Sequence, residues 1–66
     1  MGDIGFISLE CLAIRLALPQ AYLRTLISYG RIPYLRVGRW LRFDEEQVRR
    51  ALWKIAAEQT KDHDHA

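Results

Sequence analysis

The hydrophobic periodicity of this chain changes from that of helices to that of strands between Gly30 and Pro33. Before this point apolar residues recur every three or four positions, which places them on one face of a helix. After it, apolar residues alternate with arginines over residues 35–43, as they do in strands. A chain of 66 residues is long enough for one domain. The change of period therefore predicts a single small α+β domain.

Two short helices are expected ahead of the change. Ser8 can cap the first helix with its hydroxyl, and leucines then recur at helical spacing up to Leu16. Pro19 cannot continue that helix but suits the first turn of the next one. Gly30 can supply the left-handed residue that commonly ends a helix. Two helices with this separation are typical of a helix-turn-helix.

The alternating segment predicts a two-stranded β-hairpin that covers the core with one face. Its apolar members are Leu35, Val37, Leu41 and Phe43. They share a face only if Val37 lies opposite Leu41, because a shift of one residue moves a strand's side chains to the other face. This register leaves residues 38–40 as a three-residue loop with Trp40 in it. It also predicts that Arg36, Arg39 and Arg42 form one basic strip away from the core.

A third helix is expected to close the domain. Asp44 suits its N-cap, and Val48 and Ile55 belong to its buried stripe, with Trp53 at the edge of that stripe. The polar segment from Thr60 onward has little to bury and predicts disorder. We therefore expect an N-terminal arm over residues 1–5, a helix-turn-helix domain with a β-hairpin and a last helix over residues 6–59, and a disordered tail over residues 60–66.

Arginine is concentrated in the middle of the chain. Residues 11–43 carry six arginines and no carboxylate, although the net charge of the whole chain is only +2. So many guanidinium groups without an acid among them favour a polyanionic partner.

Several other classes of function are not favoured. Cys11 is the single cysteine, so neither an intramolecular disulfide nor a thiol-rich zinc site is expected. His63 and His65 lie in the polar tail without supporting ligands, and Glu45 and Glu46 suit the start of a helix better than a catalytic pair. No apolar run approaches the roughly 20 residues that span a bilayer, and no signal peptide is recognisable. We expect a cytoplasmic protein that is not an enzyme and holds no metal or cofactor.

The string GRIPYLRVGRWLRFDEEQV resembles the small excisionase-like helix-turn-helix proteins, whose winged domain is related to that of the MerR regulators. The match runs without a gap from Phe6 to about Leu52. It is carried by Gly30, Ile32, Pro33, Val37, Gly38, Arg39, Arg42 and Phe43. The resemblance implies that residues 6–59 form a winged helix-turn-helix DNA-binding domain. Its second helix would lie in the major groove of DNA and its wing, the hairpin, against the backbone or minor groove.

The same resemblance implies two kinds of function. Excisionases are recombination directionality factors that bind adjacent sites, bend DNA and direct an integrase, a tyrosine or serine recombinase, toward excision. Other members are small transcription regulators. Cooperative self-association on DNA would accompany the first function. A protein-interaction adaptor that uses Trp40, Trp53 and the last helix is an alternative of another class.

Three positions depart from the pattern of this family. Cys11 stands where a glutamate usually completes the cap of the first helix. Pro19 replaces a serine or threonine at the turn, which removes one hydroxyl that could contact phosphate. Trp40 replaces a basic or polar residue in the wing and favours an apolar contact there.

Ten side chains are candidate DNA contacts on the exposed faces of the second helix and the wing. They are Gln20, Ala21, Tyr22, Arg24, Thr25, Ser28, Arg36, Arg39, Trp40 and Arg42. Arg24 can bind guanine and Gln20 adenine in bidentate fashion. Arg39 is the candidate for the negative potential of a narrow minor groove. Tyr22 and Trp40 could instead pack on the core, and Trp40 could also contact a neighbouring protomer.

Overall fold

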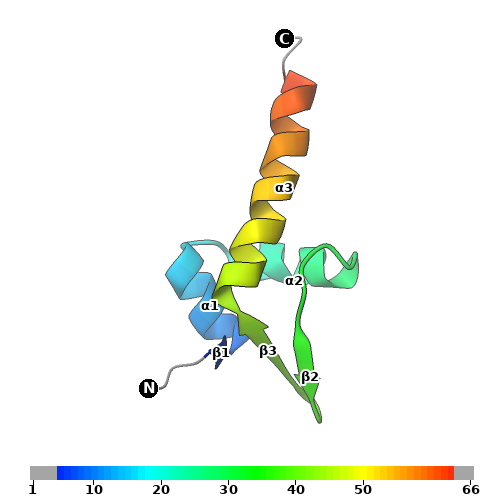
Figure 1. The fold of residues 1–66 in the computed structure, drawn as a ribbon. Coiled ribbons are helices and arrows are strands. Elements are labelled where there is room, and N and C mark those ends of the chain that lie inside the picture. The colour runs from blue at the N-terminus through cyan, green and yellow to red at the C-terminus, as the bar shows by residue number, and fades with distance from the viewer. Residues whose placement is uncertain (1–4, 64–66) are drawn as a thin grey trace.

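Residues 5–63 are described by the computed structural model, and they form a small α+β fold (Figure 1). The elements in chain order are β1 (Phe6–Ile7), α1 (Leu9–Leu16), α2 (Gln20–Ser28), β2 (Leu35–Val37), β3 (Trp40–Asp44) and α3 (Glu45–His63). The strands form an antiparallel sheet in the order β1-β3-β2. The predicted α+β class with a winged helix-turn-helix arrangement is confirmed, although the sheet has three strands rather than two.

Local signals set the ends of α1 and α2. The Ser8 hydroxyl accepts a hydrogen bond from the backbone N–H of Cys11 at 3.1 Å, which is the predicted cap of α1. Pro19 was expected in the first turn of α2, but it is the N-cap, just ahead of the first helical residue, and has extended backbone angles. Gly30 follows α2 with a φ of 68°, as predicted. Ala17 follows α1 with a φ of 57°, which the sequence did not reveal.

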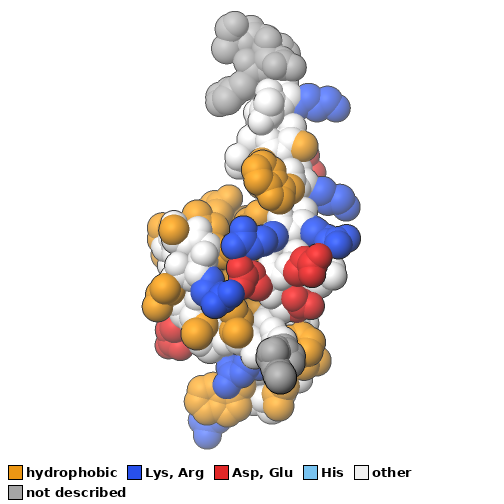
Figure 2. All heavy atoms as spheres, turned by 60° about the vertical axis from the view of Figure 1, so that its left-hand side comes forward, with side chains coloured by type: hydrophobic (Ala, Val, Ile, Leu, Met, Phe, Trp, Pro, Cys, Tyr) orange, Lys and Arg blue, Asp and Glu red, His pale blue; other side chains and the backbone are white. Residues whose placement is uncertain are grey.

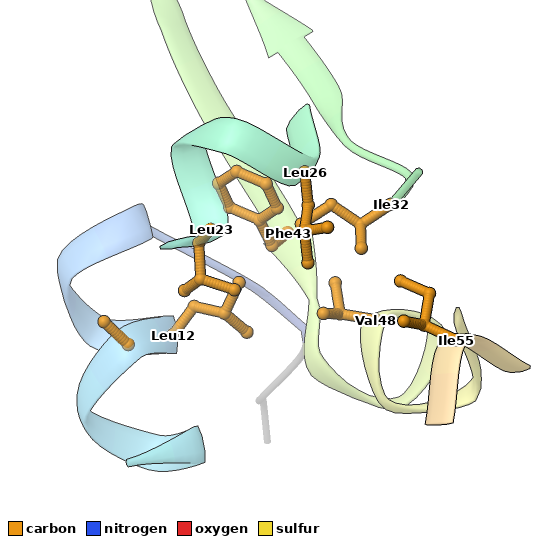
Figure 3. Packing of buried hydrophobic residues seen from close by; sticks show 8 residues of the cluster. Leu12, Leu23, Leu26, Ile32, Phe43, Val48 and Ile55 are labelled. Atoms are coloured by element: carbon orange, nitrogen blue, oxygen red, sulfur yellow. The ribbon is translucent and has the colours of Figure 1, made fainter. Parts of the chain in front are cut away.

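The core lies where the three helices meet β3. Its fully buried large side chains are Leu12 of α1, Leu23 of α2, Phe43 of β3 and Val48 of α3. Figure 3 shows these side chains converging, with Leu26, Ile32 and Ile55 completing the cluster. Burying one such side chain stabilises the fold by about 1.5–3 kcal/mol. The cluster therefore holds α2 and the base of the hairpin against the same hydrophobic core.

The predicted register of the hairpin is wrong by one residue. Val37 lies opposite Trp40, not Leu41, and the connecting turn consists of Gly38 and Arg39 alone. Gly38 has a φ of 62° while Arg39 does not have a positive φ, a combination typical of a type II′ turn. Such a turn matches the right-handed twist of the two strands, so a two-residue loop suffices.

The new register divides the apolar residues of the hairpin between its two faces. Phe43 and Leu41 pack against the core, and Arg36, opposite Leu41, lies on their side of the hairpin. Leu35 and Val37 lie on the other side and are 44% and 51% exposed, so they are not the core residues we expected. Figure 1 shows the hairpin extending beyond the helices, so the side chains at its far end have no helix to pack against.

A short strand ahead of α1 was not predicted. In β1, Phe6 pairs with Asp44 and Ile7 with Phe43, which places the beginning of the domain beside the end of β3. Two residues are too few to show the alternation that marks a strand in sequence. The expected arm over residues 1–5 lies outside the described residues except for Gly5.

The last helix begins as predicted but ends later. The Asp44 side chain accepts a hydrogen bond from the backbone N–H of Glu46 at 3.1 Å and so caps α3. The helix continues to His63, which corrects the expectation of a disordered tail from Thr60 onward; residues 64–66 lie outside the described residues. Trp53 is 72% exposed rather than part of the core edge. Figure 1 shows α3 extending away from the sheet, opposite to the direction of the hairpin.

Candidate nucleic-acid interface

The exposed face of α2 carries the predicted reading residues. Arg24 Nη2 donates a hydrogen bond to Gln20 Oε1 at 3.3 Å, so the two side chains lie together along one turn of the helix. Ala21 is exposed beside them, and Tyr22 is 37% exposed. Gln20 is the first residue of α2, the end of a recognition helix from which side chains reach base edges.

Two hydroxyl groups on α2 are already engaged. Thr25 Oγ1 donates to the carbonyl oxygen of Ala21 at 3.1 Å, and Ser28 Oγ donates to that of Thr25 at 2.9 Å. A phosphate oxygen accepts hydrogen bonds, so either hydroxyl must release its carbonyl before it can bind phosphate. Thr25 and Ser28 are therefore exposed but internally hydrogen-bonded in the free protein.

Two of the six central arginines are neutralised by α3. Arg15 of α1 pairs with Glu45, and Arg31 pairs with Glu58 at 2.8 Å. Glu45 also accepts a hydrogen bond from Arg49 at 2.8 Å. The hydrogen bonds from Arg15 and then Arg49 lower the pKa of Glu45, and the hydrogen bond to Glu45 raises the pKa of Arg15. Arg15 and Arg31 lie 30 and 27 positions from their glutamate partners. The absence of carboxylates from residues 11–43 therefore overstated the unpaired positive charge of that segment.

The remaining central arginines are Arg24, Arg36, Arg39 and Arg42, and all lie on α2 or the hairpin. None of them forms an ion pair with a carboxylate within residues 5–61, where side chains are described. All four arginines elsewhere in the chain are paired: Arg15, Arg31, Arg49 and Arg50. Arg42 Nη1 donates to the carbonyl oxygen of Leu41 at 2.8 Å, so it is hydrogen-bonded but not ion-paired. Among the described side chains, arginines without a carboxylate partner are thus confined to the two elements that a winged helix-turn-helix turns toward DNA.

The basic strip predicted for the wing is not a single face. Arg42 lies opposite Leu35 and on the same face as Trp40, whereas Arg36 lies on the reverse face. Arg39 occupies the turn. The guanidinium carbons of Arg39 and Arg42 lie 5.9 and 5.8 Å from the centre of the Trp40 ring. Figure 2 shows hydrophobic and basic side chains together at the lower end of the molecule, over the hairpin.

A shallow groove of about 250 Å³ lies between α3 and the end of α1. Its walls are Leu16, Leu18, Arg49, Leu52, Trp53 and Ala56. The groove is largely apolar and has none of the charge pattern of the wing. Trp53 was expected at the core edge and, as an alternative, in the surface of an adaptor, and the exposed ring beside this groove agrees with the second placement only in being exposed.

The described residues could also contain two other kinds of feature, a metal site and a membrane span. No group of three or more potential metal ligands occurs among them, and the side chains of His63 and His65 lie outside the described part. No described helix is long and apolar enough to cross a membrane.

Comparison with known proteins returns no match among family models, curated proteins or solved structures. The resemblance to excisionase-like proteins therefore rests on the residues quoted for it above, and the function must be argued from the surface of the molecule.

Proposed function

We propose that this protein binds double-stranded DNA through the exposed face of α2 and through the hairpin wing. The observation that carries the proposal is the separation of its arginines. Those on α2 and the wing have no carboxylate partner among the side chains of residues 5–61, whereas those on α1, on α3 and after α2 are all paired. Arginines without carboxylate partners on these two elements suit the phosphate backbone, which supplies a large share of the affinity for DNA.

Sequence preference would come from α2. A helix fits the major groove, where Arg24 can bind guanine O6 and N7 and Gln20 can bind adenine N6 and N7. Their hydrogen bond at 3.3 Å holds both side chains on the same face of α2, where Arg24 is exposed and Gln20 is half-buried. Arg36, Arg39 and Arg42 would bind phosphates from the wing and fix the register of α2 on the duplex.

Within DNA binding, the resemblance to excisionases favours a recombination directionality factor. Such a protein would occupy adjacent sites cooperatively, bend the DNA and direct a tyrosine or serine recombinase toward excision. It would act in the cytoplasm. A small MerR-like transcription regulator is the alternative within the same class. An integrase gene and an attachment site beside the coding sequence would favour the excisionase.

The first test is a mobility shift with mixed-sequence duplexes at 50 and 200 mM salt. If all four unpaired arginines bind phosphate, log K should fall with log salt with a slope of about −3.6, which weakens binding roughly a hundredfold over this range. No shift at the lower salt concentration would reject DNA binding. Selection of duplexes from a random pool would then define the preferred sequence.

A protein-interaction adaptor is a second candidate, and one observation favours it. Trp53 is 72% exposed beside the apolar groove between α3 and α1. Exposed aromatic residues beside apolar hollows are common anchors of protein interfaces. The two functions separate in the mobility shift, since an adaptor without DNA affinity would leave every duplex unshifted.

A further inference from the structure

The outer face of the hairpin carries three exposed apolar side chains beside Arg42, although the hairpin is rich in arginine. Leu35, Val37 and Trp40 are 44%, 51% and 58% exposed, and the strand pairing places them side by side on the face turned away from the core. We call these three residues the wing patch. Large apolar side chains grouped at the exposed end of an element commonly mark a contact surface.

The charge around the wing patch indicates what kind of partner covers it. Two guanidinium groups, those of Arg39 and Arg42, lie within 6 Å of the Trp40 ring, at 5.9 and 5.8 Å. Neither is paired with a carboxylate in the described part of the chain. An apolar protein surface on the wing patch would remove water from both cations without replacing it by an anion, which is costly. A partner must therefore offer apolar and anionic groups within a few ångströms of each other.

The minor groove of DNA offers both. Its floor and walls are base edges and deoxyribose, and phosphates line both rims. The groove of B-DNA is about 6 Å wide, whereas the two strands of a hairpin are about 4.8 Å apart before side chains are added. The hairpin as a whole is too broad to enter, but a single planar ring projecting from it is not. Apolar side chains that enter this groove can press between base steps and kink the duplex.

We propose that the wing patch is a DNA-contacting wedge in which the Trp40 ring enters the minor groove and Arg39 and Arg42 bind phosphates on its rims. The inference rests on the proposed function, since it assumes that the chain binds duplex DNA. It adds that an apolar side chain, and not the arginines alone, makes the wing contact. Val37, directly opposite Trp40, supports the ring from the neighbouring strand.

The presence of only two tryptophans allows a direct test. The Trp53→Phe variant keeps Trp40 as its sole tryptophan. The Trp40→Phe variant keeps Trp53 instead. Each variant is titrated with a dye-labelled mixed-sequence duplex, from an excess of protein to an excess of duplex. At the end of the titration the protein copies lie apart on different duplexes. Dye anisotropy measures binding, while tryptophan emission and its quenching by acrylamide measure the environment of the ring.

On binding, the emission of Trp40 should fall and its quenching by acrylamide should decrease severalfold, while Trp53 should change little. Binding without protection of Trp40 would overturn the wedge and leave DNA binding intact. Protection that appears only when protein exceeds DNA would assign the wing patch to a second copy of the chain and would also overturn the wedge. Absence of any anisotropy change would overturn the proposed function itself, and the wedge with it.

Affinity supplies a second measure. Trp40→Ala should weaken duplex binding about tenfold or more, as expected when an aromatic contact to nucleic acid is removed. The slope of log K against log salt should stay unchanged, because the ring itself neutralises no phosphate. Trp40→Phe should keep most of the affinity. Equal affinity of Trp40→Ala and the unaltered chain, with thermal melts confirming that both are folded, would contradict the wedge.

Discussion

Val37 lies directly opposite Trp40 in the hairpin, and this pairing decides which side chains the wing presents to its surroundings. It places Leu35 and Val37 on the outer face beside Trp40 and Arg42, and it puts Arg36 on the side of the core. Had Val37 paired with Leu41, the wing would show a purely basic outer face. The observed pairing instead makes the outer face partly apolar, which changes the expected contact with DNA.

Leu26→Ala should lower the free energy of unfolding by about 2–5 kcal/mol, because removal of a buried leucine leaves a cavity in the core. Leu26 is 7% exposed and packs in the cluster that joins α2 to β3 and α3. Urea denaturation followed by circular dichroism measures the change. Ile14→Ala is the control, since Ile14 is 79% exposed and its loss should cost little. Equal stability of the two variants would mean that α2 does not pack on this face.

Arg24→Ala should weaken binding to the preferred duplex by about 1–3 kcal/mol and relax the sequence preference. The reason is the loss of a bidentate contact that discriminates guanine from other bases. Competition shifts with the selected duplex and with base-substituted versions measure both effects. Arg50→Ala is the matched control, because Arg50 is paired with Glu46 on α3. Unchanged discrimination among duplexes in Arg24→Ala would remove Arg24 from the reading surface.

Arg39→Ala should weaken binding to all duplexes alike and reduce the slope of log K against log salt by about 1. Arg39 lies in the two-residue turn and has no carboxylate partner among the described residues. Arg31→Ala removes the same charge from a side chain already paired with Glu58. If both variants lowered the slope of log K against log salt equally, the contribution of Arg39 to binding would reflect overall charge rather than a wing contact.

The helices and their packing faces were predictable because their signals are local. Ser8, Gly30 and Asp44 act on residues within a few positions, and the apolar spacing of α1 and α2 marks their buried sides. The end of α3 was not predictable from burial, because its last turns bury little. Once a helix has formed, each further residue costs little to add, so it continues past the core.

The register of the hairpin was less predictable because apolar residues alternate on both strands. Pairing Val37 with Leu41 aligns all four apolar residues, whereas pairing it with Trp40 places Leu35 opposite Arg42 and Leu41 opposite Arg36. The predicted register rested on the assumption that all four apolar residues reach the core. The hairpin extends beyond the core, so that assumption failed. Glycine at the first position of a two-residue turn was the available signal, since Gly38 has the positive φ that a type II′ turn needs there.

The free charge of the candidate site also depended on contacts between distant segments. Glu45 and Glu58 reach back to Arg15 and Arg31 from α3, across 30 and 27 positions of the chain. Charge counted along the sequence cannot show such pairs. What the sequence did indicate was the residue types on α2 and the hairpin, and those arginines remain unpaired in the described structure.

Acid should destabilise the fold partly through Glu45. Hydrogen bonds from Arg15 and Arg49 hold the pKa of Glu45 below its ordinary value of 4.5. A carboxyl with a lowered folded-state pKa contributes stability that is present above pH 4.5 and is lost as the pH falls through the folded pKa. The melting temperature of Glu45→Gln should therefore fall less than that of the unaltered chain over this acid range. Parallel declines of the two proteins would show that Glu45 does not contribute.

Ala17 and Gly30 hold equivalent positions at the ends of α1 and α2, and this predicts a pair of opposite effects. At the first end, the N–H groups of Ala17 and Leu18 donate to Ile14 and Ala13 at 3.1 and 3.0 Å. At the second, those of Gly30 and Arg31 donate to Ile27 and Leu26 at 3.0 and 2.8 Å. Each is a Schellman motif whose first donor has a positive φ, of 57° and 68°.

A left-handed conformation costs an L-residue about 1–2 kcal/mol, and glycine gains about 0.4–1 kcal/mol of conformational entropy in the unfolded chain. Ala17→Gly should therefore raise the free energy of unfolding by about 0.5 kcal/mol. Gly30→Ala should lower it by a similar amount, because an added Cβ meets no atom within 4 Å and only the backbone is strained. Urea denaturation of both variants tests the pair. Changes of the same sign would show that the two helix ends are not equivalent.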